Sequence, residues 1–175
     1  MSKTKDNEEF VRKFQRTFGV NVDGWAGRNT DARLNEIADE LGLSHIEWHS
    51  VKASSFADPK DVEAFEECKA KGYSDSYCFR KGDNGIGAWG HNTAQEHTPM
   101  CALPRDVWQA AGKRGGSEVL LRYHGGITHK IILGDTMPNT RNIKNGAGID
   151  LNPAALKLFG MTAPILKNGF EWAWA

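Results

Sequence analysis

Residues 117–135 place the strongest constraint on the fold. Their sequence, SEVLLRYHGGITHKIILGD, holds two runs rich in β-branched, aromatic and aliphatic residues on either side of a Gly-Gly pair. In the first run Val119, Leu121 and Tyr123 recur at every second position, as they would on one face of a strand. A Gly-Gly pair between two such runs is typical of a tight hairpin turn. The stretch therefore predicts a β-hairpin and, with it, a sheet in the C-terminal part of the chain.

The rest of the C-terminal part also favours strands, with one short helix. Residues 152–160 predict that helix, with Asn152 as N-cap, Pro153 as its first residue and Gly160 at its end. The final segment, GFEWAWA, predicts a closing strand. Short strands, one helix and many glycines favour a small mixed barrel.

The N-terminal part predicts two amphipathic helices. In NEEFVRKFQRTFG (7–19), apolar residues recur at helical spacing, and Gly19 ends the helix. The turn Asp23-Gly24 follows, and NTDARLNEIADELG (29–42) predicts the second helix. A connector helix is predicted further on, with Asp58 as N-cap, Pro59 at N1 and an end near Gly72.

The segment FVRKFQRTFGVNVDGWAGRNTDARL (10–34) resembles the peptidoglycan-binding domain built from helical repeats. The run Val-Asp-Gly-x-x-Gly-x-x-Thr is the most specific part of the match, which falls on Phe14, Gln15, Gly19, Val22, Asp23, Gly24, Gly27, Thr30 and Leu34. The resemblance implies that this module binds the bacterial cell wall. The same residues also have a structural explanation, because glycines permit the turn and Thr30 caps a helix.

Two aspartates stand out in GDTMPNTRNIKNGAGIDLNPAALKLFG (134–160). Asp135 ends an apolar run, and Asp150 lies just before the Asn152 cap. ILGDTMP and IDLNPAALKLFG resemble the paired aspartate motifs of expansins and of the rare lipoprotein A family. MCALPRDVW (100–108) and GIGAWG (85–90) are similar to two further segments of that domain. The resemblance spans roughly 80–175 and implies a six-stranded double-psi β-barrel.

The expected architecture is therefore α+β: a small helical module followed by that barrel with short helices. We expect a peptidoglycan-binding-like module at 1–48, a helical connector at 49–78 and the barrel at 79–175.

The resemblance also implies roles for the two aspartates. In the resembling lytic transglycosylases a single aspartate protonates the leaving oxygen and then deprotonates the sugar's own hydroxyl. We expect Asp135 to be this general acid/base. Asp150 lies near the positive end of a helix dipole, which favours its ionised form, so it would order the loop or stabilise positive charge on the sugar. The structural alternative is that Asp150 anchors a cap and Asp135 a turn.

The chain departs from the family patterns at several places. Met137 stands where expansins carry an aromatic residue, DTMP replaces the D-R-G-P of rare lipoprotein A, and Cys101-Ala102 replaces a histidine-containing element. The choice between cleaving glycan and only binding it therefore stays open at this point.

Further polar and aromatic residues are candidates for contacting a glycan. An aromatic ring matches the apolar face of a pyranose, so Trp89 is a candidate for stacking, with a place in the core as its alternative. The candidate substrate-binding set is Asp83, Trp89, His91, Thr93, Met137 and Asn139.

Other chemistries have weaker support. Cys101 with His91, His97 or His124 would be a thiol nucleophile and base, as in a cysteine peptidase or amidase. His91, His97 and Asp83 would be the zinc alternative, but their spacing matches no familiar ligand pattern. We expect neither a metal nor a cofactor.

Composition limits the remaining functions. The chain has 175 residues, 22 Lys+Arg and 22 Asp+Glu, so its formal net charge is zero, which disfavours bulk nucleic-acid binding. We expect neither a nucleic-acid nor a membrane partner, because apolar runs fall short of a bilayer span. No secretory signal is recognised at the N-terminus, which favours synthesis in a cytosol. The odd number of cysteines, three, then favours reduced thiols, with a Cys68–Cys78 bridge as the alternative.

The sequence as a whole predicts a monomeric protein that degrades or remodels peptidoglycan. Its expected partner is the glycan strand, its expected activity is that of a lytic transglycosylase or glycosidase, and it would act at the wall, as a phage endolysin does in an infected host. The alternatives are a non-catalytic, expansin-like glycan-binding protein and a structural phage component.

Overall fold

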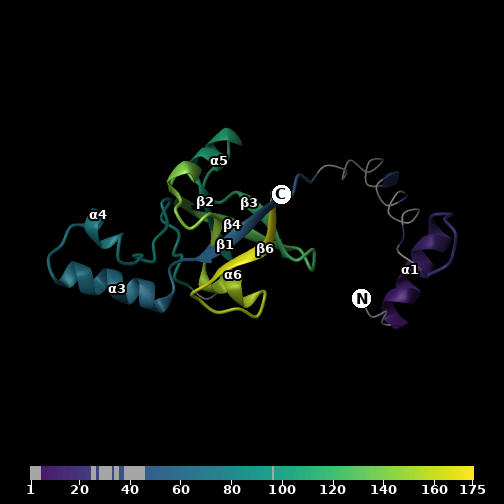
Figure 1. Ribbon diagram of the computed structural model, residues 1–175, viewed down its shortest axis with the longest axis horizontal. Helices are drawn as coiled ribbons and strands as arrows, with labels where there is room; N and C mark the ends of the chain where they lie inside the picture. The colour runs from purple at the N-terminus through teal and green to yellow at the C-terminus, as the bar shows by residue number, and fades with distance from the viewer. Residues whose placement is uncertain (1–4, 25–26, 28–32, 34–35, 38–45, 96) are drawn as a thin grey trace. The chain divides into compact units, whose positions relative to one another are not determined.

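The computed structural model describes residues 5–24, 27, 33, 36–37, 46–95 and 97–175. The chain divides into two compact units, residues 1–46 and 47–175. Figure 1 shows the helices and strands of both units.

In the first unit, helix α1 (Lys5–Thr17) is followed by a turn that returns to it. Gly19, with φ +69°, lies beyond the helix end as predicted. The buried Gln15 side chain ties the turn to the helix: its Nε2 donates to Asp23 Oδ1 at 2.8 Å, and its Oε1 accepts from the Gly24 amide at 2.9 Å. A Cβ at Gly24 would lie 2.9 Å from the side chain of Arg12. Folding alone thus accounts for Gln15, Asp23 and Gly24 in the motif.

The second predicted helix, 29–42, lies mostly outside the described residues. Of that stretch the structure describes Arg33, Glu36 and Ile37, which are helical, and Arg33 pairs with Glu36 at 2.8 Å.

The second unit is a closed six-stranded barrel with the strand order β1-β5-β2-β4-β3-β6 (Figure 1). Pairs β1–β5 and β2–β4 are parallel and the others are antiparallel. The strands are β1 (His49–Ser55), β2 (Met100–Pro104), β3 (Glu118–Tyr123), β4 (His129–Met137), β5 (Ala147–Leu151) and β6 (Leu166–Trp174). The predicted hairpin (β3–β4), the closing strand and the α+β barrel class are confirmed.

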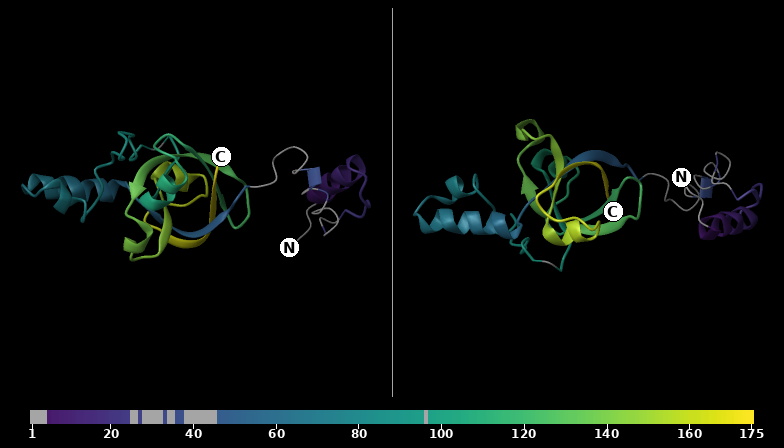
Figure 2. Two further views of the ribbon diagram at one scale, coloured as in Figure 1. Left: turned by 90° about the horizontal axis from the view of Figure 1, so that it is seen from above. Right: turned by 60° about the horizontal axis from the view of Figure 1, so that its bottom comes forward.

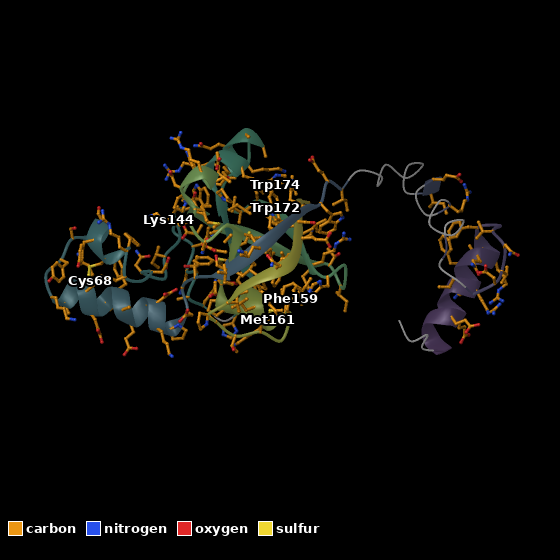
Figure 3. All side chains as sticks on the ribbon, viewed as in Figure 1. Cys68, Lys144, Phe159, Met161, Trp172 and Trp174 are labelled. Carbon is orange, nitrogen blue, oxygen red and sulfur yellow. A yellow bond between two sulfur atoms is a disulfide. The ribbon has the colours of Figure 1, made fainter. Side chains whose placement is uncertain are left out.

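Side chains from all six strands fill the barrel. The largest fully buried ones include Phe170, Leu103, Leu121, Ile131, Leu133, Ile149 and Leu151. Trp172 and Trp174 contact each other edge to face on β6, with ring centroids 5.2 Å apart (Figure 3).

The barrel begins at His49, within the segment expected to be a helical connector. Strand β1 is HSVKASS, in which Ala53 is buried and Val51 is partly buried against the core. Because its core-facing residues are small, its alternation is too weak to be recognised in the sequence.

The secondary structure around the two aspartates also differs from the prediction, because both residues lie inside strands. Asp135 lies within β4, which continues to Met137, rather than at the strand end. Asp150 lies within β5, a strand that the sequence did not predict, rather than at the opening of a helix. Strand β5, AGIDL, is only five residues long and follows a glycine-containing turn, so its pattern resembles a loop.

Short helices connect the strands. They are α3 (Pro59–Ala70), α4 (Asp75–Cys78), α5 (Arg105–Ala110), the 3-10 turn η1 (Thr140–Asn142) and α6 (Pro153–Lys157). Two predicted N-caps are confirmed: Asp58 accepts from the Lys60 amide and Asn152 from the Ala155 amide, each at 2.9 Å. The predicted cap Thr30 lies outside the described residues. Helix α6 ends at Lys157, before the predicted Gly160, because the tight turn that follows it begins there.

Helices α3 and α4 form a hairpin that extends away from the barrel (Figure 2). A disulfide joins Cys68 on α3 to Cys78 on α4, with Cα atoms 5.5 Å apart. The expectation that these thiols stay reduced is therefore wrong. The hairpin has only Phe65 and the two cysteines as its buried cluster, and such a small unit needs a covalent link to hold its shape.

Among the described residues, no helix is both long and apolar enough to cross a bilayer.

Candidate functional site

Strand register brings the two aspartates into one row across the barrel. Ser54 on β1 pairs with Asp150 on β5, Asp150 pairs with Ala102 on β2, and Ala102 pairs with Asp135 on β4. Because neighbouring strands lie about 4.8 Å apart, the Cα atoms of Asp135 and Asp150 are roughly 10 Å apart. We call these four residues the aspartate row.

The row faces outward from the barrel. Ala53, Cys101, Ile149 and Leu151, which precede or follow its members along the strands, all lie in the barrel core. Successive side chains point to opposite faces of a strand, so the row lies on the outer face of the barrel wall. Other segments cover part of it, because Ser54 is 8% exposed and Ala102 is 2% exposed. Both aspartate side chains are partly exposed.

A β-bulge aligns Asp135 with the row. Cys101 pairs with Leu133 and the next residue, Ala102, pairs with Asp135, so Gly134 is the extra residue. Without this bulge, Asp135 would be one position out of register with Asp150. Bulges commonly redirect a side chain beside an active site.

The loop that carries residues 82–94 holds the Asp135 carboxylate. Asp135 Oδ1 accepts from the amide of Ala88 at 2.7 Å and from its own neighbour Thr136 at 2.8 Å. The loop lies so close that a Cβ at Gly87 would be 2.1 Å from the Gly134 carbonyl oxygen. Burial raises the pKa of Asp135, while the two amide donors oppose that rise by stabilising the carboxylate.

Asp150 is the more deeply buried of the pair and accepts a hydrogen bond from the Ser54 hydroxyl. Burial raises its pKa to about 6; the Ser54 bond lowers it, and the charges of Asp135, Asp61 and Asp83 raise it. Burial therefore acts against the ionised form that a helix dipole was expected to favour. Helix α6 has only five residues, and desolvation outweighs its dipole.

Asp83 and Asp61 extend the group of carboxyls. The Asp83 amide donates to the Asp61 carbonyl at 3.2 Å, and Asp83 Oδ1 accepts from the Gly85 amide at 2.7 Å. The pKa of Asp83 is raised to about 6, chiefly by burial; the Gly85 bond lowers it, and the charges of Asp135 and Asp61 raise it. Asp83, a predicted candidate, thus lies within electrostatic reach of the aspartate row.

Sequence reasoning missed Ser54 and Asp61. Ser54 belongs to the unrecognised strand β1, where only the register with β5 reveals its partner. Asp61 lies in the first turn of α3, where an acidic residue is ordinary. No local signal in the sequence distinguishes either residue.

Other predicted binding residues are largely enclosed. Thr93 is fully buried, and Met137 is 4% exposed although it borders the hollow that Asn139 also lines. Trp89 packs edge to face on Trp108, with centroids 5.2 Å apart, and a Cβ at Gly115 would lie 2.4 Å from its ring. These contacts support a packing role for Trp89, which was its alternative assignment, and its ring remains partly exposed.

His91 and Asn139 keep some exposure. The His91 carbonyl accepts from the Gly87 amide at 2.8 Å, so its backbone shapes the loop that reaches Asp135. Asn139 lines a surface hollow of about 430 Å³ together with Arg105, Thr136 and Asn142. Thr136 follows Asp135 directly, so this hollow adjoins the β4 end of the row.

The thiol and zinc alternatives find no supporting geometry. Cys101 is fully buried in the barrel core, and burial raises the pKa of its thiol far above the ordinary value. In the part of the chain that the structure describes, no three histidine, cysteine or acidic side chains are grouped closely enough to hold a metal ion.

No family model and no curated protein matches the chain. One solved structure that resembles it is the Streptomyces papain inhibitor (SPI), with 21% identity and a TM-score of 0.41 over 74% of this chain and 94% of that chain. A likeness at this score carries no argument about function, and the closed barrel is established by its own strand pairing.

Proposed function

We propose that the barrel cleaves peptidoglycan glycan strands in the manner of a lytic transglycosylase. The observation that carries the proposal is the aspartate row: Asp135 and Asp150 share one outward face, and Asp150 has a pKa of about 6. A carboxyl that titrates near neutral pH is suited to act first as an acid and then as a base.

The environments of the two aspartates divide the roles between them. The protonated Asp150 donates its proton to the glycosidic oxygen, and the bond from that oxygen to the anomeric carbon breaks. The sugar's own C6 hydroxyl then attacks that carbon and gives its proton to the Asp150 carboxylate, which regenerates the acid and forms an anhydro-sugar without consuming water. Asp135, whose ionised form two amides stabilise, offsets the positive charge at the reacting carbon. This assignment reverses the roles expected from the sequence.

Asp83 and Ser54 support this division. The charge of Asp83 helps to keep the pKa of Asp150 high, and the Ser54 hydroxyl fixes one oxygen of Asp150. A second carboxyl with a pKa of about 6 also makes the site more active in mildly acidic conditions than in alkaline ones.

The finer assignments belong to the same proposal. They are the double-psi topology, kinship with expansins and rare lipoprotein A proteins, wall binding by the N-terminal module, and an endolysin-type role. The Cys68–Cys78 disulfide supports action outside a reducing cytosol, where such bonds persist.

The test is an incubation of purified peptidoglycan with the wild type and with the Asp150→Asn and Asp135→Asn variants, followed by mass spectrometry of the soluble products. The matched control is Asp106→Asn, because Asp106 is an exposed aspartate outside the row that bonds to Thr140. We expect anhydro-sugar ends from the wild type and the control, and their loss in Asp150→Asn.

Other products would refute the proposal and indicate a different activity. Reducing ends would indicate a hydrolase, and freed amino groups would indicate a peptidase or amidase. Sedimentation with sacculi without soluble product would indicate an expansin-like binding protein.

A further inference from the structure

The α3–α4 hairpin holds two aromatic side chains at its surface. Tyr73 is 50% exposed and Tyr77 is 40% exposed, and their ring centroids lie 4.8 Å apart. Neither belongs to the buried cluster of Phe65, Cys68 and Cys78. The two rings therefore lie outside the buried cluster of the hairpin, with about half of each side chain open to solvent.

A disulfide, a hydrogen bond and an ion pair hold the backbone around the two tyrosines in place. The disulfide joins Cys68 on α3, labelled in Figure 3, to Cys78 on α4, the residue that follows Tyr77. Lys69 Nζ donates to the Tyr73 carbonyl at 3.4 Å and pairs with Asp75 Oδ1 at 2.5 Å. Gly72, with φ +84°, makes the turn that leads into Tyr73. A surface fixed before binding loses less entropy when a ligand arrives.

The tyrosines border a hollow with polar and charged groups around it. The hollow measures about 380 Å³ and is lined by Tyr73, Tyr77, Lys71, Lys81 and Glu67, among others. Lys81 Nζ lies 5.8 Å from the centre of the Tyr77 ring. This volume falls within the range of about 300–1,000 Å³ that is usual for small-ligand sites.

These features match the chemistry of a sugar ring. An aromatic ring packs against the apolar C–H face of a pyranose, while hydroxyl, amide and carboxylate groups of a glycan find donors in Lys71 and Lys81 and an acceptor in Glu67. A docked protein would need roughly 800 Å² on each side, far more than two rings in one small hollow supply. The observations therefore favour a glycan over a protein partner.

We propose that the α3–α4 hairpin is a glycan-binding site, separate from the aspartate row, that takes a sugar residue of a peptidoglycan strand. The identity of the glycan rests on the proposed function. The site would hold the strand beside the barrel while the row acts on another bond.

The test measures binding in the Asp150→Asn background, so that no strand is cut. The probes are chitotetraose, by titration calorimetry, and purified sacculi, by sedimentation. We expect a Tyr73→Ala/Tyr77→Ala variant to bind chitotetraose about tenfold more weakly or worse, and Tyr73→Phe/Tyr77→Phe to stay within about threefold, since its ring faces remain. The matched control is Ile127→Ala, which removes an apolar side chain that is 79% exposed.

The outcomes separate the two proposals. Unchanged affinity in the double-alanine variant, or an absence of chitotetraose binding by the Asp150→Asn parent, would overturn the glycan site whatever the peptidoglycan assay gives. Loss of anhydro-sugar products in Asp150→Asn, with full binding through the tyrosines, would support both. Continued cleavage by Asp150→Asn would refute the catalytic assignment and leave the binding result standing.

Discussion

The buried Asp150 carboxyl suits the proposed catalysis, but its ionised form should lower the stability of the folded protein. Burial raises its pKa from 3.8 to about 6, so the folded protein holds this carboxylate at a cost. One pKa unit corresponds to about 1.4 kcal/mol, so the ionised form destabilises the barrel by up to about 3 kcal/mol. The Asp150→Asn variant, which keeps an oxygen for the Ser54 hydroxyl, should therefore be more stable than the wild type above pH 6 by about 1–3 kcal/mol.

The sign of the pH dependence follows from proton binding. Between pH 3.8 and about 6 the folded state binds more protons at Asp150 than the unfolded state does, so stability falls as the pH rises through this window. Below the window the wild type carries no such penalty. The advantage of Asp150→Asn should therefore be largest at pH 7.5 and small at pH 4.

Urea unfolding followed by tryptophan fluorescence at pH 7.5 and pH 4 measures both values. The control is Asp106→Asn, because Asp106 bonds to the Thr140 amide and hydroxyl, which lower its pKa, so its loss should not stabilise the protein at pH 7.5. A gain for Asp150→Asn that is equal at the two pH values, or a loss at pH 7.5, would refute the claim that burial holds this carboxyl near neutrality.

Three further substitutions test other parts of the molecule. Ser54→Ala removes a bond that lowers the pKa of Asp150, so the pH profile of glycan cleavage should move upward by about half a unit to one unit; an unmoved profile would disconnect Ser54 from the acid. Gly87→Ala places a Cβ 2.1 Å from the Gly134 carbonyl oxygen, so the free energy of unfolding should fall by about 1–3 kcal/mol in urea titrations, and an unchanged midpoint would contradict the close approach. Gln15→Ala removes the side-chain acceptor of the buried Gly24 amide and a donor to Asp23, so thermal melts of the α1 signal by circular dichroism should show a loss of about 1–3 kcal/mol, which an unaltered melt would disprove.

Local chemistry made several elements predictable. Asp58 and Asn152 cap helices because a short side-chain oxygen reaches the free amides one turn on, and no distant residue is needed for that bond. The hairpin around Gly125 follows from alternation and a turn, which also lie within one segment. These features depend on neighbours in the chain, so the sequence reveals them.

The arrangement of the candidate site depends on contacts between residues that are far apart in the sequence. The sequence singled out Asp135 and Asp150, but it placed them at a strand end and a helix start and assigned the acid role to Asp135. Strand register and the bulge at Gly134 decide which residues share a row. Burial under segments far along the chain decides which carboxyl holds a proton.

The Cys68–Cys78 bond shows the same division. The sequence supplied two cysteines ten positions apart, but only the packing of α3 against α4 brings their Cα atoms to 5.5 Å. By itself the sequence determined helix caps, turns and the β-rich character of the C-terminal part, because these are settled by atoms a few bonds away. Tertiary structure alone decided the disulfide, the aspartate row and its proton affinities, because each requires strands or helices from separate parts of the chain to meet.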